Sequence, residues 1–135
     1  VVDPAGGQIV AGARKLRGEG FADTMQVLKG FVGRQILRFA RQSNTVIGVV
    51  ATDAALSKEE ANKVAQMAQD GLARAIRPAH TMFDGDTIFA LSTGRRRADV
   101  NLVGAYAAEV TAQAILRGIL AATPAGGLPA ARDFR

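Results

Sequence analysis

The sequence contains no cysteine, no tryptophan and a single histidine. Without cysteine, neither a disulfide framework nor a thiolate metal site can form. A Ser-His-Asp triad would have to use His80, which lies between a helix stop and an acidic turn, a position more typical of a hydrogen-bonding loop residue. No glycine pattern matches a nucleotide-binding loop, and Asp53, Asp84 and Asp86 do not form a dependable metal set. We therefore expect no cofactor and no metal.

Long hydrophobic runs are also missing. The longest, Val46 to Ala51, is far short of the roughly 20 residues that a membrane helix needs. No basic start followed by an apolar segment suggests a signal peptide. We expect no membrane partner, and the composition is compatible with the cytoplasm. The 135 residues, 48% of them apolar, suffice for one compact domain.

The net charge of +5 is unevenly distributed, since residues 1–44 carry +4 of it. Apolar residues recur at helical spacing between Phe21 and Phe39, but Gly30 and Gly33 make this stretch a poor isolated helix. We interpret it as a mobile, partly helical basic tail and expect no nucleic-acid partner. The alternative is a surface for an acidic partner. Residues 1–11 are predicted to form two short extended pieces joined by a turn.

The chain from residue 45 onward predicts strand, helix, strand, helix. Residues 45–52 are rich in β-branched side chains and indicate a buried strand, and residues 87–93 indicate a second one. Ser57 and Glu60 have capping-box spacing at the start of a helix that must end before Pro78. Residues 101–122 predict another helix, with these apolar residues available for packing: Leu102, Ala105, Tyr106, Val110, Ala114, Ile115 and Leu116. Residues from about 123 onward are expected to form a loose tail.

A junction before the first strand, Gln42-Ser43-Asn44-Thr45, is the strongest chemical signal. A threonine that becomes the first residue of a chain has its own α-amino group as a base, and the ordinary pKa of that amine is about 7.7–8.0. The Thr45 hydroxyl can also attack the preceding carbonyl and cleave the Asn44-Thr45 bond. By itself, however, this dipeptide is usually an ordinary loop end.

An acidic turn, Phe83-Asp84-Gly85-Asp86-Thr87, follows about forty residues later. If it leads into a strand, Asp84 and Asp86 project to the same side, and of two carboxylates held close one tends to keep a proton. Such a pair can steer the proton of the threonine. The alternative is a solvated turn in which Gly85 takes a positive φ and the aspartates bond local amides.

The runs Asn44 to Ala54, Gly71 to Pro78 and His80 to Leu91 together resemble a family of self-processing hydrolases with an amino-terminal nucleophile. This family comprises L-aminopeptidase/D-esterase, the β-peptidyl aminopeptidases and the 6-aminohexanoate-oligomer (nylon oligomer) hydrolases. The likeness is greatest to the nylon-oligomer branch, which uses threonine and an Asp-Gly-Asp turn. It covers roughly residues 1 to 122.

The resemblance implies autocleavage between Asn44 and Thr45, with Thr45 as nucleophile, Asp84 beside it and Asp86 in support. Residues 1–44 would then end an α-part, and residues 45–135 would form the β-subunit. The implied fold is α/β (α+β), a four-layered α-β-β-α sandwich only partly present here, with the Thr45 strand central. The implied reaction is hydrolysis of amide bonds in small peptides, amides or ω-amino acid oligomers.

The family also uses a lysine and an asparagine from a longer α-part, so we assign neither role to Lys15, Lys29 or Asn101. We expect the chain to be a fragment whose partners are the rest of its α-part and further αβ units in a homo-oligomer. Two alternatives stay open. One is acyl transfer of the ornithine acetyltransferase type, and the other is an inactive, unprocessed binding domain.

Overall fold

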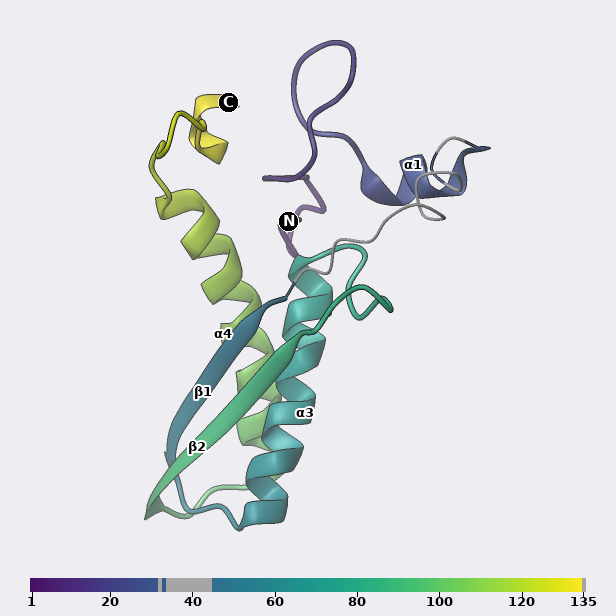
Figure 1. Ribbon diagram of the computed structural model, residues 1–135. Coiled ribbons are helices and arrows are strands. Elements are labelled where there is room, and N and C mark those ends of the chain that lie inside the picture. The colour runs from purple at the N-terminus through teal and green to yellow at the C-terminus, as the bar shows by residue number, and fades with distance from the viewer. Residues whose placement is uncertain (32, 34–44, 135) are drawn as a thin grey trace.

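The computed structural model describes residues 1–31, 33 and 45–134. Two strands, β1 (Ile47–Ala54) and β2 (Thr87–Arg96), pair in parallel. Helix α3 (Lys58–Ala75) connects them and α4 (Val100–Ala121) follows β2. Both helices lie on the same side of the strands (Figure 1). This is the α/β class expected from the sequence, and the described residues supply one helical layer and one sheet layer of the four.

The parallel register starts with Ile47 opposite Thr87 and continues to Thr52 opposite Ser92. It shifts before Ala54, which pairs with Arg96, and Gly94 lies in this irregular stretch with φ of 70°. A positive φ is easy for glycine and costly for other residues, so glycine suits the bulge. Because side chains alternate along a strand, every second residue of each strand faces the helices.

Helix α3 begins where the capping signal predicted. The Ser57 side chain accepts a hydrogen bond from the Glu60 amide (3.2 Å), and the Glu60 carboxylate accepts one from the Ser57 amide (2.8 Å). The helix ends at Ala75, before Pro78. Its apolar residues at helical spacing form the core: Val64, Ala68 and Leu72 are fully buried and cluster with Ile88 and Ala107.

Helix α4 packs differently from the prediction. Its buried residues are small, namely Gly104, Ala107, Ala108 and Ala112. The prediction was wrong for Leu102, Tyr106 and Val110, which are 56%, 60% and 48% exposed. Ile115 does pack against the core, as predicted. Small residues allow α3 and α4 to approach closely at Gly71 and Gly104.

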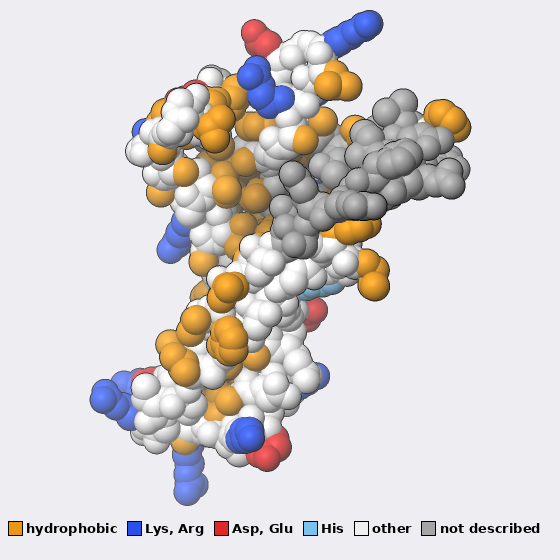
Figure 2. Space-filling model, in the orientation of Figure 1, with side chains coloured by type: hydrophobic (Ala, Val, Ile, Leu, Met, Phe, Trp, Pro, Cys, Tyr) orange, Lys and Arg blue, Asp and Glu red, His pale blue; other side chains and the backbone are white. Residues whose placement is uncertain are grey.

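The second face of the sheet is apolar and exposed. Along it lie Ile47, Val49, Phe89 and Leu91, which are 72%, 62%, 56% and 57% exposed. Figure 2 shows hydrophobic side chains over the region of β1 and β2. Residues 45–52 were expected to form a buried strand, but no element among the described residues covers this face.

The segments outside this core are mostly irregular. Val2 and Ile9 form an antiparallel bridge, which confirms the predicted pair of extended pieces. A short helix, α1 (Thr24–Lys29), begins the basic stretch. Residues from about 123 onward, which were expected to form a loose tail, finish with the 3-10 helix η1 (Ala131–Phe134). There the Phe134 ring packs edge-on against the Phe21 ring, with 5.5 Å between the ring centroids. None of the described helices combines the length and apolar content required to cross a bilayer.

Candidate active site

The candidate nucleophile lies at the edge of the sheet where both parallel strands begin. Thr45 is exposed and precedes β1 by two residues. The amide of Thr87, the first residue of β2, donates to the Val46 carbonyl (2.9 Å). Because the strands are parallel and in this register, the turn before β2 comes to lie beside Thr45. The two segments that the sequence analysis singled out, about forty residues apart, are therefore neighbours.

Gly85 is the residue of that turn that approaches the nucleophile. A Cβ atom built on Gly85 would lie 3.0 Å from the Thr45 Oγ1 and 3.9 Å from its Cβ and Cγ2. Gly85 does not adopt a positive φ, so the solvated-turn interpretation gave the wrong reason for a glycine here. What the position requires is space, because a side chain would press against the threonine hydroxyl.

Asp86 fixes the chain immediately after the candidate nucleophile. Its Oδ1 accepts a hydrogen bond from the Val46 amide at 2.9 Å, across 40 residues of sequence. This bond ties the first residues of one strand to the turn that precedes the other. Asp86 therefore restrains the main chain that follows Thr45.

Asp84 is held by the residue three positions before it. Its Oδ2 accepts hydrogen bonds from the Thr81 hydroxyl (2.8 Å) and the Thr81 amide (2.9 Å). These two bonds hold the pKa of Asp84 below its ordinary value of 3.8, with a smaller contribution from the charge of His80. Asp84 is therefore held as a carboxylate, which argues against a shared proton residing on it.

The other predicted residues lie as follows. Asn44 falls outside the described residues, so the predicted cleavage junction is described only from the Thr45 side. His80 is exposed, with φ of 56°, in the loop that leads to Thr81. Thr81 and Gly85 received no role in the site from the sequence. The Thr-x-x-Asp spacing of residues 81–84 is a recognised side-chain turn signal and could have identified Thr81.

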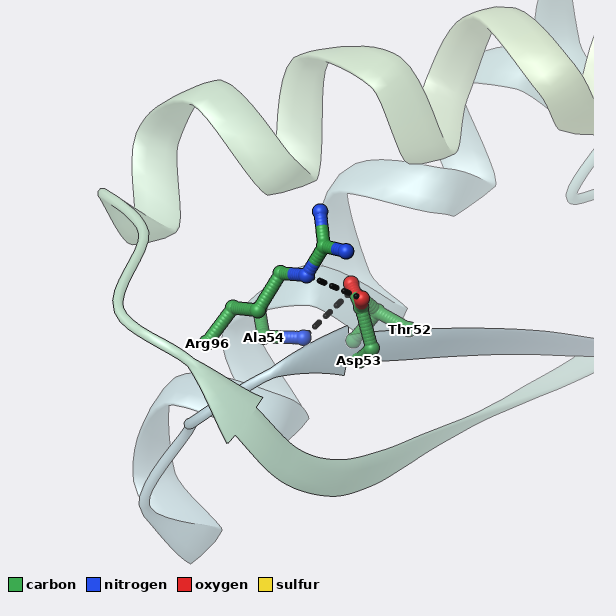
Figure 3. A network of polar contacts seen from close by, with 4 residues as sticks. All are labelled: Thr52, Asp53, Ala54 and Arg96. Carbon is green, nitrogen blue, oxygen red and sulfur yellow. Dashed lines mark hydrogen bonds and ion pairs between the residues drawn. The ribbon is translucent and has the colours of Figure 1, made fainter.

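Three consecutive arginines, Arg95 to Arg97, lie at the opposite end of the strands. Arg96 belongs to β2, and its Nε lies 3.0 Å from Asp53 Oδ2. Figure 3 shows this pair beside the bond from the Ala54 amide to the Thr52 hydroxyl (3.1 Å). Eight residues of extended chain separate Asp53 from Thr45, a distance of about 26 Å. Arg96 is thus too remote to hold a substrate at Thr45.

The geometry brings together a threonine hydroxyl, a glycine that leaves room in front of it, and two carboxylates in one turn. A hydroxyl next to a new amino terminus is an activated nucleophile when its own amine accepts the proton. Among the described residues, no group of three or more His, Cys, Asp or Glu side chains could hold a metal ion.

Comparison with known proteins gives a consistent result. An uncharacterized aminopeptidase of Mycobacterium tuberculosis is 48% identical over 106 residues, covering 67% of this chain and 31% of the relative. One from Mycobacterium leprae is 50% identical over 101 residues, covering 64% and 28%. A 6-aminohexanoate-oligomer endohydrolase of Kocuria sp. is 32% identical over 95 residues, covering 61% and 27%.

The chain spans less than a third of the length of the curated relatives that it matches, between 27% and 31%. The family model that matches it, by contrast, covers residues 5–132, which include both strands, helices α3 and α4 and the acidic turn. The chain therefore belongs to peptidase family S58.

Proposed function

We propose that these residues form part of a self-cleaving amidohydrolase in which Thr45 is the amino-terminal nucleophile. The observation that carries the proposal is the close approach of Thr45 to the acidic turn. The Thr45 Oγ1 lies 3.0 Å from the position that a Cβ atom of Gly85 would occupy, and Gly85 lies between Asp84 and Asp86. Membership of a peptidase family agrees with it. So do the names of relatives, one an aminopeptidase and one an oligomer endohydrolase.

Self-cleavage comes first in the proposed sequence. The Thr45 hydroxyl attacks the carbonyl of Asn44, and the acyl group moves from the Thr45 nitrogen to its oxygen. This shift breaks the C–N bond, and the hydroxyl proton goes to the nitrogen, which becomes a free Thr45 amine. Water then hydrolyses the ester, releasing the Asn44 carboxylate and restoring the Thr45 hydroxyl. Throughout, the bond from the Val46 amide to Asp86 keeps the Thr45 main chain in place.

Substrate hydrolysis then uses the same oxygen. The Thr45 amine takes the hydroxyl proton as Oγ1 attacks the substrate amide carbonyl, and it passes that proton to the departing amine. The resulting ester is attacked by water, whose proton goes to the Thr45 amine and then back to Oγ1 as the acid leaves. Asp84 and Asp86 orient the amine and the hydroxyl. Donors for the oxyanion come from the remainder of the protein.

The substrate class follows the same relatives. We propose linear amides with a free amino end, either small peptides or oligomers of ω-amino acids. Acyl transfer to ornithine has less support, because the relatives above are named as an aminopeptidase and an endohydrolase. A purely binding role has less support for the same reason. Release of free acid, measured with and without added ornithine, separates hydrolysis from transfer.

We also propose that the exposed face of the sheet contacts the rest of the same protein. Ile47, Val49, Phe89 and Leu91 present a continuous apolar surface there. A face of this kind is normally buried in a folded protein, and an α-β-β-α sandwich would bury it against a second sheet. Assembly of αβ units into a homo-oligomer would use other surfaces, including the exposed side of α4.

The decisive experiment is intact mass spectrometry with amino-terminal sequencing of the full-length protein. We expect two chains, the second beginning Thr-Val-Ile-Gly, and a single uncut chain for Thr45→Ala. Thr45→Ser is the matched control, since it keeps a hydroxyl and should still be cleaved. An uncut wild-type protein with undiminished hydrolytic activity would refute the proposal.

A further inference from the structure

Thr81 makes an unusually complete set of contacts with Asp84. The Asp84 amide donates to the Thr81 carbonyl (3.0 Å), which closes a turn over residues 81–84. The Thr81 amide and hydroxyl both donate to Asp84 Oδ2, at 2.9 and 2.8 Å. The Thr81 hydroxyl oxygen in turn accepts a bond from the Phe83 amide at 3.2 Å. Every polar group of Thr81 is therefore engaged within this one turn.

The direction of these bonds is settled by the chemistry of the groups. A hydroxyl has one hydrogen and two lone pairs, an ionised carboxylate can only accept, and a backbone amide can only donate. The amide of Phe83 occupies a lone pair of Thr81 Oγ1, and the hydroxyl hydrogen goes to Asp84. This arrangement suits a negatively charged Asp84, because bonds to a charged acceptor are about twice as strong as neutral ones.

Both donors of Thr81 act on the same carboxylate oxygen. With Oδ2 held in this way, the plane of the Asp84 carboxylate is fixed and Oδ1 is left to accept from another donor. Asp84 is joined directly to Gly85, the residue that abuts the Thr45 Oγ1. The proposed reaction places two donors there in turn, the amine of the new amino terminus and the hydroxyl of Thr45.

We propose that Thr81 is a positioning residue, which holds Asp84 so that its second oxygen accepts a hydrogen bond from Thr45 during hydrolysis. The proposal rests on the function proposed above. Thr81 does not touch the substrate, and it acts only through Asp84. A protonated Asp84 would present a donor to the Thr45 amine, and a rotated Asp84 would not reach it. In both cases the amine would lose the acceptor that orients its lone pair.

A purely structural role for Thr81, as a brace for the turn, makes a different prediction. A brace would matter whether or not residue 84 is ionised, whereas a positioning residue matters only while there is a carboxylate to position. A double-mutant cycle separates the two, because residues that act through one another show non-additive effects.

The test uses full-length protein, with rates expressed per processed chain, on an aminoacyl p-nitroanilide and on a 6-aminohexanoate oligomer. The variants are Thr81→Val, Thr81→Ser, Asp84→Asn, the Thr81→Val/Asp84→Asn pair and Thr45→Ala. We expect Thr81→Val to lower kcat about 10- to 100-fold with little change in KM, which is the scale of a lost hydrogen bond to a charged group. Thr81→Ser, which keeps the hydroxyl, should stay within roughly threefold of wild type.

In the Asp84→Asn background, Thr81→Val should lower kcat by less than about threefold. The acid limb of the kcat/KM profile, which the Thr45 amine sets, should also move to lower pH in Thr81→Val but not in Thr81→Ser, because a displaced Asp84 carboxylate stabilises the protonated amine less. His80, Asp86 and the Thr45 amine are the other titrating groups near Asp84, and both variants retain them. Circular dichroism checks folding, and Thr81→Ala replaces the valine variant if that one is unfolded.

The proposal is overturned if Thr81→Val has the kcat of wild type, or if it lowers kcat by the same factor in the Asp84→Asn background as in the wild-type background. Failure of the underlying function has a separate signature. In that case Thr45→Ala would be processed and active, whatever the Thr81 variants do.

Discussion

Replacement of Gly71 by alanine tests the close approach of the two helices. A Cβ atom on Gly71 would lie 2.1 Å from the Ala108 carbonyl oxygen, and 2.9 Å from both the Ala108 carbonyl carbon and the Thr111 Cβ. Ordinary contacts between carbon atoms are about 3.5–4.0 Å. The obstacle is backbone, which cannot rotate away, so α3 and α4 would have to separate by about 1 Å at this point.

The expected effect is a net loss of stability. Alanine gains up to about 1 kcal/mol over glycine inside a helix. Overpacking a tight core costs about 1–3 kcal/mol, and separating the helices also weakens the neighbouring contact of Gly104 with Met67. We expect Gly71→Ala to destabilise the fold by about 2 kcal/mol.

Gly118 provides the matched control within α4. A Cβ atom there would meet nothing within 4 Å, so Gly118→Ala should stabilise the protein by up to about 1 kcal/mol through helix propensity alone. Urea unfolding of the full-length protein, followed by circular dichroism, gives both values. The reasoning is refuted if Gly71→Ala is as stable as Gly118→Ala.

Three further predictions concern the site and its surroundings. Gly85→Ala should slow self-cleavage at least tenfold, because its Cβ would displace the Thr45 hydroxyl; a time course on denaturing gels measures this, and unchanged cleavage would contradict it. Asp84 has a lowered pKa, so it stabilises the fold above pH 3.8, the ordinary value, and this contribution is lost as pH falls through the lower folded value. The stability gap between wild type and Asp84→Asn should therefore be constant near neutrality and close in acid, as urea titrations at several pH values would show. Phe89→Asp should prevent association with the rest of the protein, whereas Asn62→Asp, at an exposed position on α3, should not; co-purification of the parts distinguishes them.

The sequence predicted the elements whose signals are local. Helix α3 has its capping box at Ser57 and Glu60, a regular apolar stripe and a proline shortly after its end, so its bounds and its core face were both recoverable. Helix α4 lacks such a contrast, since apolar residues surround it. Size decides its packing face instead: Gly104 and Ala108 lie against α3, and Tyr106 does not. Hydrophobicity alone cannot reveal that choice.

The candidate site was recoverable to a different extent. The family resemblance pointed to Thr45, Asp84 and Asp86, and the parallel register accounts for how residues forty apart come together. The contributions of Thr81 and Gly85 depend on which groups meet in the folded turn. One is a set of hydrogen bonds to a single carboxylate oxygen, and the other is an empty volume. Neither can be deduced from the residue types alone.

The layer of two helices is wider than the sheet of two strands, and this difference bears on how the rest of the protein meets the candidate site. Neighbouring strands are about 4.8 Å apart and packed helices about 8–10 Å apart, so two helices side by side cover more strands than the two described here. Leu102, Tyr106 and Val110 of α4 are 56%, 60% and 48% exposed. Thr45 and its turn lie at the end of the same narrow sheet. Under the proposed function, whatever widens and covers this sheet also encloses the nucleophile, which would link self-cleavage to completion of the fold.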